Sequence, residues 1–445
     1  MITWREGEVR ELLPGWAGVQ VLGVEVQGER VRALGYPDLV GSAVVGDRVL
    51  LNVTALERGL GTGGYALVVA LPDRPDAWPR RAEGEPGHLV KGRYAPLQPM
   101  VLGVDDPEGE HHATLAQADD LGGMPVLATD LHSALPAVLA GVRAERPRAR
   151  VAYVMTDGAA LPLAWSRTVA GLREAGWLAS TVTAGQAFGG DLEAVTVHTA
   201  LLAARHVVGA DLAVVIQGPG NLGTETRWGF SGVAAGEALN AAAVLGGRPV
   251  AGLRVSQADA RERHRGLSHH STTAFGRVLA HPADLPVPVL PPAQRTASAA
   301  DAPSGHTGRA PDARSGHTEP APDAPSGHTG RAPDARSGHT EPAPDAPSGQ
   351  TGHAPDAPSG HTGRVGDSVA LRECLALVHR QARDLVRAAP HLELVEVATE
   401  DLPEALAQVP VPLSTMGRGL GDDPAAFLTA AAAGRYAARL VVDPS

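Results

Sequence analysis

Residues 1–92 carry the pattern of a small all-β domain. Apolar positions alternate with polar ones or form short runs, as in GVQVLGVEVQGERVRALGY and GDRVLLNVTA, and glycine and aspartate separate the runs. Alternation with a period of two places one face of a strand in a core, and short runs separated by turn residues are typical of sandwiches and barrels. We therefore predict a small β-barrel over residues 1–92.

From residue 93 the pattern changes to short apolar runs that alternate with amphipathic helices. The expected strands are MPVLAT, RVAYVMT, LASTVT, DLAVVIQ, PVAGLRV, LELVEVAT and a short VPLST. Helical spacing occurs in LPLAWSRTVAGLREAG and in DLEAVTVHTALLAARHV, for which Asp191 is the expected N-cap. Strands that alternate with helices pair in parallel through right-handed crossovers. The prediction is a doubly wound, mostly parallel α/β sheet.

Residues 293–365 interrupt this pattern. The units APDAPSGHTGR and APDARSGHTEP recur there with a period of eleven residues. Because the repeats contain no large apolar side chain, they cannot bury enough surface to offset the entropy of ordering the chain. Their histidines lack the fixed geometry that a metal site needs. We predict a disordered insertion in one α/β domain, which consists of residues 93–292 and 366–445.

Composition limits the classes of partner. The formal net charge is -11, so no excess of basic residues is available to neutralise a nucleic-acid backbone. The first residues are charged, the apolar runs are too short to cross a bilayer, and Cys374 is the single cysteine. We expect a soluble cytoplasmic protein that binds neither nucleic acid nor a membrane. The sequence does not predict its oligomeric state.

A glycine-rich loop, QGPGNLGTETRWGFSG, follows the expected strand DLAVVIQ and contains the pattern G-x-G-x-x-G. A dinucleotide loop should follow the first strand and open a helix at once, with an acidic residue about twenty residues further on. None of these conditions holds, so NAD(P) is not expected. A simple turn is one remaining interpretation, and a ligand loop is the one we favour. Its expected contact residues are Gly218, Gly220, Asn221, Gly223, Thr224 and Arg227.

Short polar loops follow other expected strands. Asp130 ends one strand, Asp157 ends the next, and STMGRGLGDDP, with Arg418, follows the last. A turn role is the alternative for each pair taken singly. Ligands of open α/β sheets bind outside the carboxyl ends of the strands, so the whole set predicts a crevice there. Asp130 or Asp157 would be a general base or a ligand of a divalent cation.

The segment RERHRGLSHHSTTAFGRVL follows PVAGLRV, and Ser268 is its expected N-cap. Arg263, Arg265 and the helix start suit a bound anion, a metal is a second interpretation, and capping is a third. His269 and His270 point about 100° apart on a helix, so a metal would require another ligand. The candidates for that ligand are His111, His112, His132 and Asp157.

Lys91 is the only lysine of the chain. A desolvated lysine can act as a base or form an imine, which arginine cannot do. Lys91 is therefore a further catalytic candidate, with chance retention as the alternative.

Five segments resemble an uncharacterised bacterial family known as domain of unknown function 3866: GPGNLGTETRWGFSG, RHRGLSHHS, TDGAALPLA, AFGGDLEAV and STMGRG. The resemblance covers about residues 1–292 and 366–440, and it implies no activity. The residues themselves support two hypotheses, an enzyme that acts on a small phosphate- or carboxylate-bearing metabolite and a non-catalytic binding or sensing module. The predicted catalytic residues are Asp130, Asp157 and Lys91; the predicted ligand-binding residues are Gly218, Gly220, Asn221, Gly223, Thr224, Arg227, Arg263, Arg265, Ser268, His269, His270 and Arg418.

Deletion of residues 300–364 should leave the fold intact, because the repeats contribute no core. A thermal melt of the deletion variant, followed by circular dichroism, should agree with that of the full chain within a few degrees. A cooperative loss of folding in the variant would refute the prediction of an insertion without structure.

Overall fold

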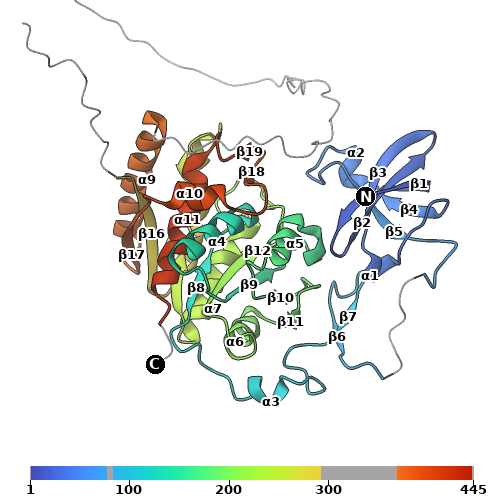
Figure 1. Ribbon diagram of the computed structural model, residues 1–445, viewed down its shortest axis with the longest axis horizontal. Coiled ribbons are helices and arrows are strands. Elements are labelled where there is room, and N and C mark those ends of the chain that lie inside the picture. Colours follow the sequence, from blue (N-terminus) through green and yellow to red (C-terminus); the bar gives the residue numbers. More distant parts are fainter. Residues whose placement is uncertain (1, 78–83, 292–367, 443–445) are drawn as a thin grey trace, which may run out of the picture. The chain divides into compact units, whose positions relative to one another are not determined.

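The computed structural model describes residues 2–77, 84–291 and 368–442, and Figure 1 shows how their elements are arranged. The predicted insertion, residues 293–365, lies outside the described residues.

The first part of the chain is the predicted barrel. Its strands are β1 (Trp4–Trp16), β2 (Val19–Val26), β3 (Glu29–Gly35), β4 (Arg48–Asn52) and β5 (Ala66–Ala70), with the short helices α1 (Pro37–Val40) and α2 (Thr54–Glu57) between them. The barrel is closed in the order β1-β2-β3-β5-β4, and only the β3–β5 pair is parallel. Alternate side chains such as Val9, Leu22 and Val49 fill the interior.

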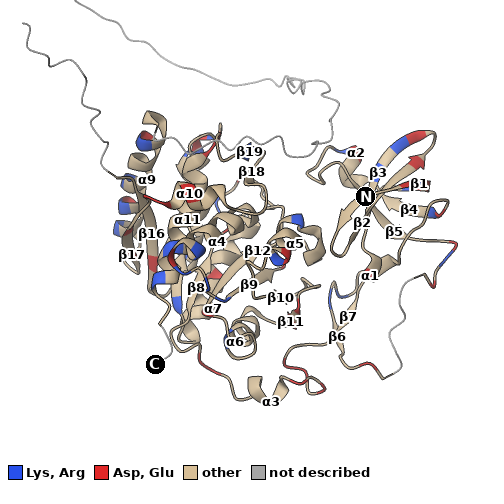
Figure 2. Cartoon of the chain, in the orientation of Figure 1, with Lys and Arg blue, Asp and Glu red and all other residues tan. Residues whose placement is uncertain are grey.

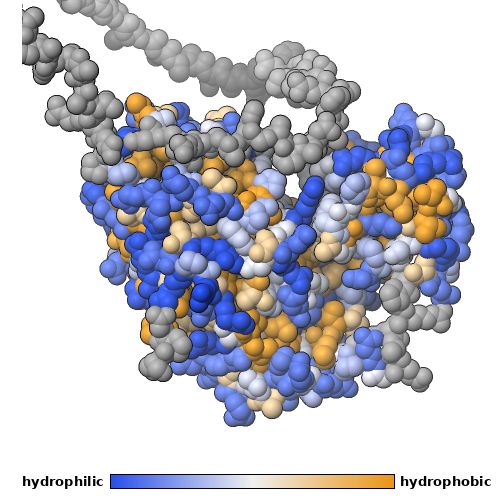
Figure 3. All heavy atoms as spheres, viewed as in Figure 1, coloured by the Kyte–Doolittle hydropathy of each residue, from blue (hydrophilic) through white to orange (hydrophobic). Residues whose placement is uncertain are grey.

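Charged residues of both signs occur along the barrel strands (Figure 2), and those in ion pairs are largely exposed. Arg10, on β1, contacts Glu8 on the same strand and Glu25 on β2. Hydrophobic residues are exposed between the hydrophilic ones in Figure 3, and Leu12 and Val45 are among the exposed apolar side chains. Each barrel strand has one buried and one solvent-exposed face, which accounts for the alternation of apolar and polar residues in the sequence.

A second sheet contains eight strands, all parallel, in the order β11-β10-β9-β12-β8-β13-β16-β17. Its strands are β8 (Pro125–Ala128), β9 (Val151–Thr156), β10 (Ser180–Ala184), β11 (Leu192–Ala194), β12 (Leu212–Gln217), β13 (Arg248–Ala251), β16 (Ala283–Val289) and β17 (Leu392–Ala398). β16 precedes the predicted insertion and β17 follows it, yet the two strands are paired. One sheet is therefore built from both sides of that segment.

Helices connect these strands: α4 (Leu135–Glu145), α5 (Arg167–Glu174), α6 (Val197–His206), α7 (Ala234–Val244), α9 (Val369–Ala388), α10 (Leu402–Ala407) and α11 (Pro424–Arg439). The step from β8 to β9 and the step from β12 to β13 run in opposite directions across the sheet. Right-handed crossovers therefore place α4 and α7 on opposite faces. α11 packs with α4, and α6 packs with α7 (Figure 1). The predicted doubly wound α/β fold is confirmed.

Three local predictions are corrected. Asp191 does not cap α6, whose N-cap is Thr196; the Asp191 carboxylate instead binds Thr181 and the guanidinium of Arg173. The residues after Asp191 form β11, because a parallel edge strand can pair there with β10.

VPLST is not a sheet strand, since β18 (Ser414–Thr415) forms a separate antiparallel pair with β19 (Arg418–Gly419). β16 was not predicted as a strand, because its sequence, ADLPVPV, contains two prolines, which are rare inside a sheet.

Within the described ranges, no helix combines the length and the apolar character that a membrane crossing requires.

Two glycines allow α4 and α11 to approach closely. A Cβ atom at Gly141 would overlap the carbonyl oxygen of Ala431, and one at Gly434 would overlap that of Val138. The clashing atoms are backbone, so they cannot rotate away. The alanine-rich side of α11, which includes Ala432 and Ala433, is fully buried. The core that α11 forms with β8 and β16 therefore depends on the close packing of α11 against α4.

Gly434→Ala should destabilise the protein, although alanine normally favours a helix by about 0.5–1 kcal/mol over glycine. The overlap with Val138 should dominate and lower the free energy of unfolding by about 1–3 kcal/mol. Urea denaturation followed by circular dichroism measures the change. Gly421→Ala is the matched control, because no atom lies within 4 Å of the added methyl group. Equal stability of the two variants would contradict the packing argument.

Candidate functional site

The cavity of interest lies where the strand order reverses. β8 is the first strand of the large sheet, and its neighbours are β12 and β13. The chain first proceeds from β8 toward β9, β10 and β11, then returns through β12 and continues on the other side of β8. Ligands of such sheets bind at this switch point, outside the carboxyl ends of the strands. A cavity of about 510 Å³ is lined by the loops that follow β8, β12 and β13.

Asp130 follows β8 and is buried, with 2% of its surface exposed. Its Oδ2 lies 3.3 Å from Nη1 of Arg254, in the loop after β13, and 3.0 Å from Nδ1 of His270, further along the chain. Its backbone carbonyl accepts a hydrogen bond from Nε2 of Gln217, at the end of β12, with a length of 2.8 Å. Burial alone would raise the pKa of Asp130, but the hydrogen bond from His270 and the charge of Arg254 hold it below its ordinary value.

Nδ1 of His270 also lies 2.9 Å from Nη1 of Arg254. Nδ1 can make only one of these two hydrogen bonds, because a guanidinium only donates and an ionised carboxylate only accepts. We assign the proton of Nδ1 to the bond with Asp130, so the contact with Arg254 is not a hydrogen bond. This assignment leaves the lone pair on Nε2 of His270. The ring is held from its other side by Phe230, which stacks on it with centroids 3.8 Å apart and planes at 5°.

The glycine-rich loop after β12 is shaped by close backbone contacts. A Cβ atom at Gly218 would come within 2.8 Å of the carbonyl oxygen of Ala160, and Gly220 has a φ of 92°, which favours glycine. Oδ1 of Asn221 accepts a 3.0 Å hydrogen bond from Ser231 and fixes the end of the loop. Gly218, Gly220, Asn221 and Gly223 all line the cavity. The loop turns without opening a helix at once, since the next helical residues begin at Ser231.

Three histidines gather beside this loop. His264 follows the strand β14 (Val255–Ser256), and His269 and His270 begin helix α8 (His269–Thr273). β14 and β15 (Gly266–Leu267) form a hairpin, which brings His264 back toward the start of α8. Ring centroids are 4.9 Å apart for His264 and His269, 4.9 Å for His264 and His270, and 4.4 Å for His269 and His270. One nitrogen of each ring lies within 4.8 Å of the others.

Ser268 organises this cluster as the predicted N-cap of α8. Its hydroxyl oxygen accepts a hydrogen bond from the backbone N–H of His270 and lies 2.8 Å from Nδ1 of His264. Burial, together with the nearby charges of Arg254 and Arg261, lowers the pKa of His264 to about 3. Burial also lowers the pKa of His269. Both shifts favour the neutral form of the ring.

Arginines surround the histidines, and each is paired with a carboxylate. Arg254 bonds Asp130, Arg263 lies 2.8 Å from Glu225, and Arg261 forms two bonds of 2.8 and 2.9 Å with Asp259. The bonds from Arg261 hold the pKa of Asp259 well below its usual range.

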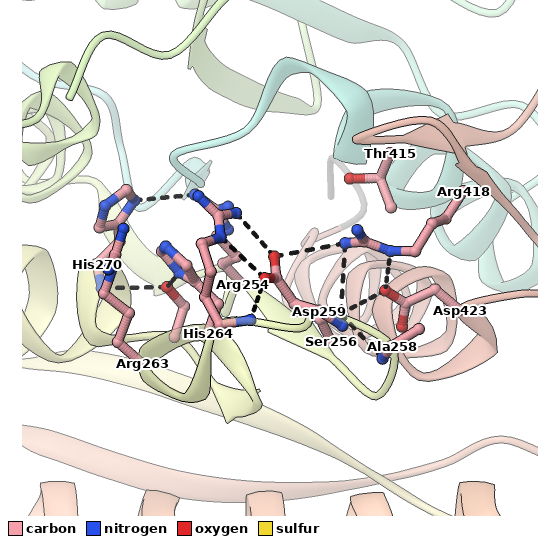
Figure 4. Close-up of polar contacts among 12 residues, drawn as sticks. Arg254, Ser256, Ala258, Asp259, Arg263, His264, His270, Thr415, Arg418 and Asp423 are labelled. Carbon is pink, nitrogen blue, oxygen red and sulfur yellow. Dashed lines mark hydrogen bonds and ion pairs between the residues drawn. The ribbon is translucent and has the colours of Figure 1, made fainter. Parts of the chain in front are cut away.

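A further arginine supports this network from outside the cavity. Figure 4 shows Arg418 between the carboxylates of Asp259 and Asp423. Nε of Arg418 donates a 3.1 Å hydrogen bond to Asp423, which begins α11. The same aspartate accepts hydrogen bonds from Ser256 and from the backbone of Gln257. Arg418 thus fastens the loop after β13 and does not itself line the cavity.

The cavity collects buried polar atoms that have no partner. Buried polar groups of native proteins are nearly always hydrogen-bonded. Among the described residues, twelve buried side-chain atoms lack a partner, and five of them belong to residues that line this cavity. These five atoms are Asp130 Oδ1, Gln217 Oε1, Asn221 Nδ2, Arg263 Nε and His269 Nε2. Their concentration indicates a site that is completed by a ligand, an ion or water.

The structure brings together eight of the predicted residues as lining of the cavity: Asp130, Gly218, Gly220, Asn221, Gly223, Arg263, His269 and His270. The other predicted residues lie elsewhere. Asp157 is exposed at the end of β9, where its Oδ2 accepts a 2.9 Å hydrogen bond from the backbone of Gln186. Thr224 and Arg227 lie in an exposed turn, and Arg265 is exposed.

Lys91 is buried at the hairpin of β6 (Leu89–Val90) and β7 (Met100–Val101) and does not line the cavity. Its Nζ donates to the carbonyl oxygens of Ala187, at 3.0 Å, and Ala194, at 2.9 Å, and lies 3.4 Å from Oε2 of Glu193. Burial lowers the pKa of Lys91, and the charge of Glu193 opposes this shift. All three donors of the ammonium group face acceptors, an arrangement that fixes structure and leaves no donor for a substrate.

Several residues of the site were not predicted from the sequence: Arg254, Arg261, His264 and Gln217. His132, which the sequence offered as a candidate metal ligand, also lines the cavity. The available signal was the spacing of three histidines within seven residues in HRGLSHH. The prediction for His269 and His270 considered only their positions on a helix. It did not foresee the β14–β15 hairpin, which brings His264 next to them.

Comparisons with known proteins agree with the resemblance seen in the sequence. The family described as "Protein of unknown function (DUF3866)" matches residues 32–314 and 364–434. The chain belongs to this family. The match to the DUF3866 family begins within β3 of the barrel and omits residues 315–363, which make up most of the repeats. No curated protein and no solved structure matches the chain.

His132 lines the same cavity of this DUF3866 protein but is wholly committed to internal bonds. Its Nε2 lies 2.7 Å from the hydroxyl of Ser166, which also caps α5, and its Nδ1 lies 3.1 Å from the hydroxyl of Tyr153. Ser166 accepts from the backbone of Val169. Burial lowers the pKa of His132 to about 4.

The low pKa of His132 should make stability depend on pH. Between pH 6.5 and pH 4 the unfolded chain binds a proton at this histidine that the folded protein does not bind. The free energy of unfolding should therefore fall as pH falls through this window, by up to about 1.4 kcal/mol per pH unit from this group. Urea denaturation from about pH 7 to about pH 4.5 should give a shallower dependence for His132→Gln than for the natural chain. His198→Gln, at an exposed histidine, should retain the original slope; identical slopes for all three proteins would contradict the assignment.

Proposed function

We propose that this DUF3866 protein is an enzyme that acts on a small metabolite bearing a phosphate or carboxylate group, bound in the cavity outside β8, β12 and β13. The observation that supports this most strongly is the set of five unpartnered buried polar atoms at the switch point of the sheet. A cavity of about 510 Å³ accommodates a small metabolite, since ligand pockets commonly measure about 300–1,000 Å³.

Recognition of the anionic group would involve Arg263 and the glycine-rich loop. Arg263 uses one end of its guanidinium for Glu225, while its Nε has no partner. Nδ2 of Asn221 is a second free donor directed from a loop whose glycines permit close approach of backbone. Charge-assisted hydrogen bonds from a guanidinium to an oxyanion are about twice as strong as neutral ones.

The chemistry would centre on His270. Asp130 holds the proton of Nδ1, so the lone pair of Nε2 is available as a base or as a donor to an electrophile. The carboxylate would orient the imidazole and stabilise its positive charge when it takes a proton. This role for Asp130 differs from the direct general base that the sequence suggested, because its carboxylate is already bound by Arg254.

The alternative is a non-catalytic module that binds or senses the same ligand. A buried ion pair that touches a histidine is costly to desolvate, and a binding module has less need of it. The contact between Asp130 and His270 therefore favours an enzyme. We also propose that the protein resides in the cytoplasm and that NAD(P) and nucleic acids are not its ligands, in agreement with the acidic charge and the loop geometry.

Arg263→Ala should weaken the binding of inorganic pyrophosphate or citrate by about 10- to 100-fold, which is the loss of about 1.5–3 kcal/mol from a charged hydrogen bond. Isothermal calorimetry on the full chain measures the affinity. Arg277→Ala removes an exposed arginine outside the cavity and is the control. Equal affinities for both variants, or saturable binding of NADH, would overturn the proposed ligand class.

The enzymatic part is tested by incubating the protein with a panel of phosphorylated and carboxylated metabolites and detecting products by mass spectrometry. Asp130→Asn should abolish turnover, because the amide cannot stabilise the positive charge of His270. Circular dichroism verifies that this variant, which loses one member of a buried ion pair, is folded. Binding without turnover of any member of the panel would favour the binding module.

A further inference from the structure

We propose that His264, His269 and His270 form a binding site for a divalent transition metal such as zinc. This site shares the cavity of the proposed function, but it is argued from the histidines alone and does not require an anion to bind. With a metal bound, the lone pair on Nε2 of His270 would bind the ion, so His270 could not also act as the base. The donor set is three imidazoles whose candidate nitrogens all lie within 4.8 Å of one another. Imidazole is a ligand that suits zinc, copper, nickel and iron.

The spacing of the three rings is close to what a metal requires. Zinc–nitrogen bonds of about 2.0–2.1 Å in a tetrahedron separate neighbouring nitrogens by about 3.4 Å. Small rotations of the three side chains would bring the nitrogens from their present spacing to this value. Nε2 of His269 is buried and has no hydrogen-bond partner, so its lone pair is free to bind a metal.

The contacts on the far side of two rings are those of metal-binding histidines. Such histidines donate their other N–H to a carboxylate or another oxygen, which fixes the tautomer and directs the free nitrogen to the ion. Nδ1 of His270 meets the carboxylate of Asp130 at 3.0 Å, and Nδ1 of His264 meets the hydroxyl of Ser268 at 2.8 Å. No partner is found for Nε2 of either ring within the described part of the chain.

The charges around the histidines also permit a metal. The three nearby guanidiniums would repel a cation, but Arg254, Arg261 and Arg263 are each paired with a carboxylate, so the surroundings are close to neutral.

Three protein ligands would leave the metal open toward the cavity. Structural zinc sites are closed by four protein ligands, whereas catalytic sites use three and leave a position for water or substrate. All three histidines line the cavity that also contains Arg263 and the glycine-rich loop. An anionic oxygen held by Arg263 could therefore reach the open position. The substrate class that follows is one that presents an oxyanion to both a metal and a guanidinium.

Cobalt(II) titration of the full chain tests the site, because cobalt in a four- or five-coordinate nitrogen site has strong visible absorption. The natural protein, after treatment with a chelator, should bind one equivalent with this spectrum, and zinc should displace it. His269→Ala should lose both the spectrum and that equivalent. His269 is partly exposed, so its removal should spare the fold, and circular dichroism verifies this. His198→Ala, at an exposed histidine outside the cavity, should behave as the natural protein.

Two further variants test which residues hold the metal and how Asp130 contributes. The double change His317→Ala and His328→Ala, in the repeats, should leave the cobalt spectrum unchanged; loss of the spectrum there would assign the metal to the repeats and overturn the proposal. Asp130→Asn should weaken metal binding by about 10- to 100-fold while retaining the visible spectrum, as for other carboxylates behind a ligand histidine. A natural chain with no visible cobalt spectrum, or a His269→Ala variant that keeps it, would also overturn the site.

The experiment distinguishes this site from the proposed function. If pyrophosphate binds through Arg263 and cobalt gives no spectrum, the anion site stands and the metal site falls. If cobalt binds through His269 and no anion binds, the metal site stands and the proposed substrate class falls.

Discussion

Asp130 is the residue on which the cavity depends, because its backbone and its buried carboxylate together join three segments of the chain. Its backbone carbonyl accepts a hydrogen bond from Gln217 at the end of β12, and its side chain binds Arg254, after β13, and His270, in α8. Gly232 lets the chain after β12 pass against Asp130, since a Cβ atom there would clash with it. Removing one member of a buried ion pair costs about 3–5 kcal/mol. Such a contact fixes the loops and also orders the imidazole of His270.

Much of the fold could be predicted because its signals are local. The central strands β8, β9 and β12 are continuous apolar runs, buried at every position, and each is followed by small polar residues. The N-cap of α8 also follows from the sequence, because Ser268 precedes a polar helix start. The crevice at the carboxyl ends was predictable in the same way, since parallel strands bring their ends to one edge.

The failures arise where a distant contact decides the structure. Leu192–Ala194 forms a strand only because an edge of β10 is available, and local propensity for a helix is overridden there. Arg254 looks like part of a strand in PVAGLRV, but β13 ends at Ala251 and the arginine turns toward Asp130. Lys91 was singular in composition, yet its partners are carbonyls about a hundred residues further along the chain. No local pattern carries that information.

The charge balance of the cavity connects the two proposals. The pairs Arg254–Asp130, Arg261–Asp259 and Arg263–Glu225 bring equal numbers of opposite charges. The cavity therefore has little net charge that would attract or repel a cation or an anion that binds alone. A divalent ion on the histidines would make the cavity positive and raise its affinity for an oxyanion, and by thermodynamic linkage the oxyanion would raise the affinity for the metal by the same factor. Each ligand could therefore bind alone, and each would bind more tightly when the other is present.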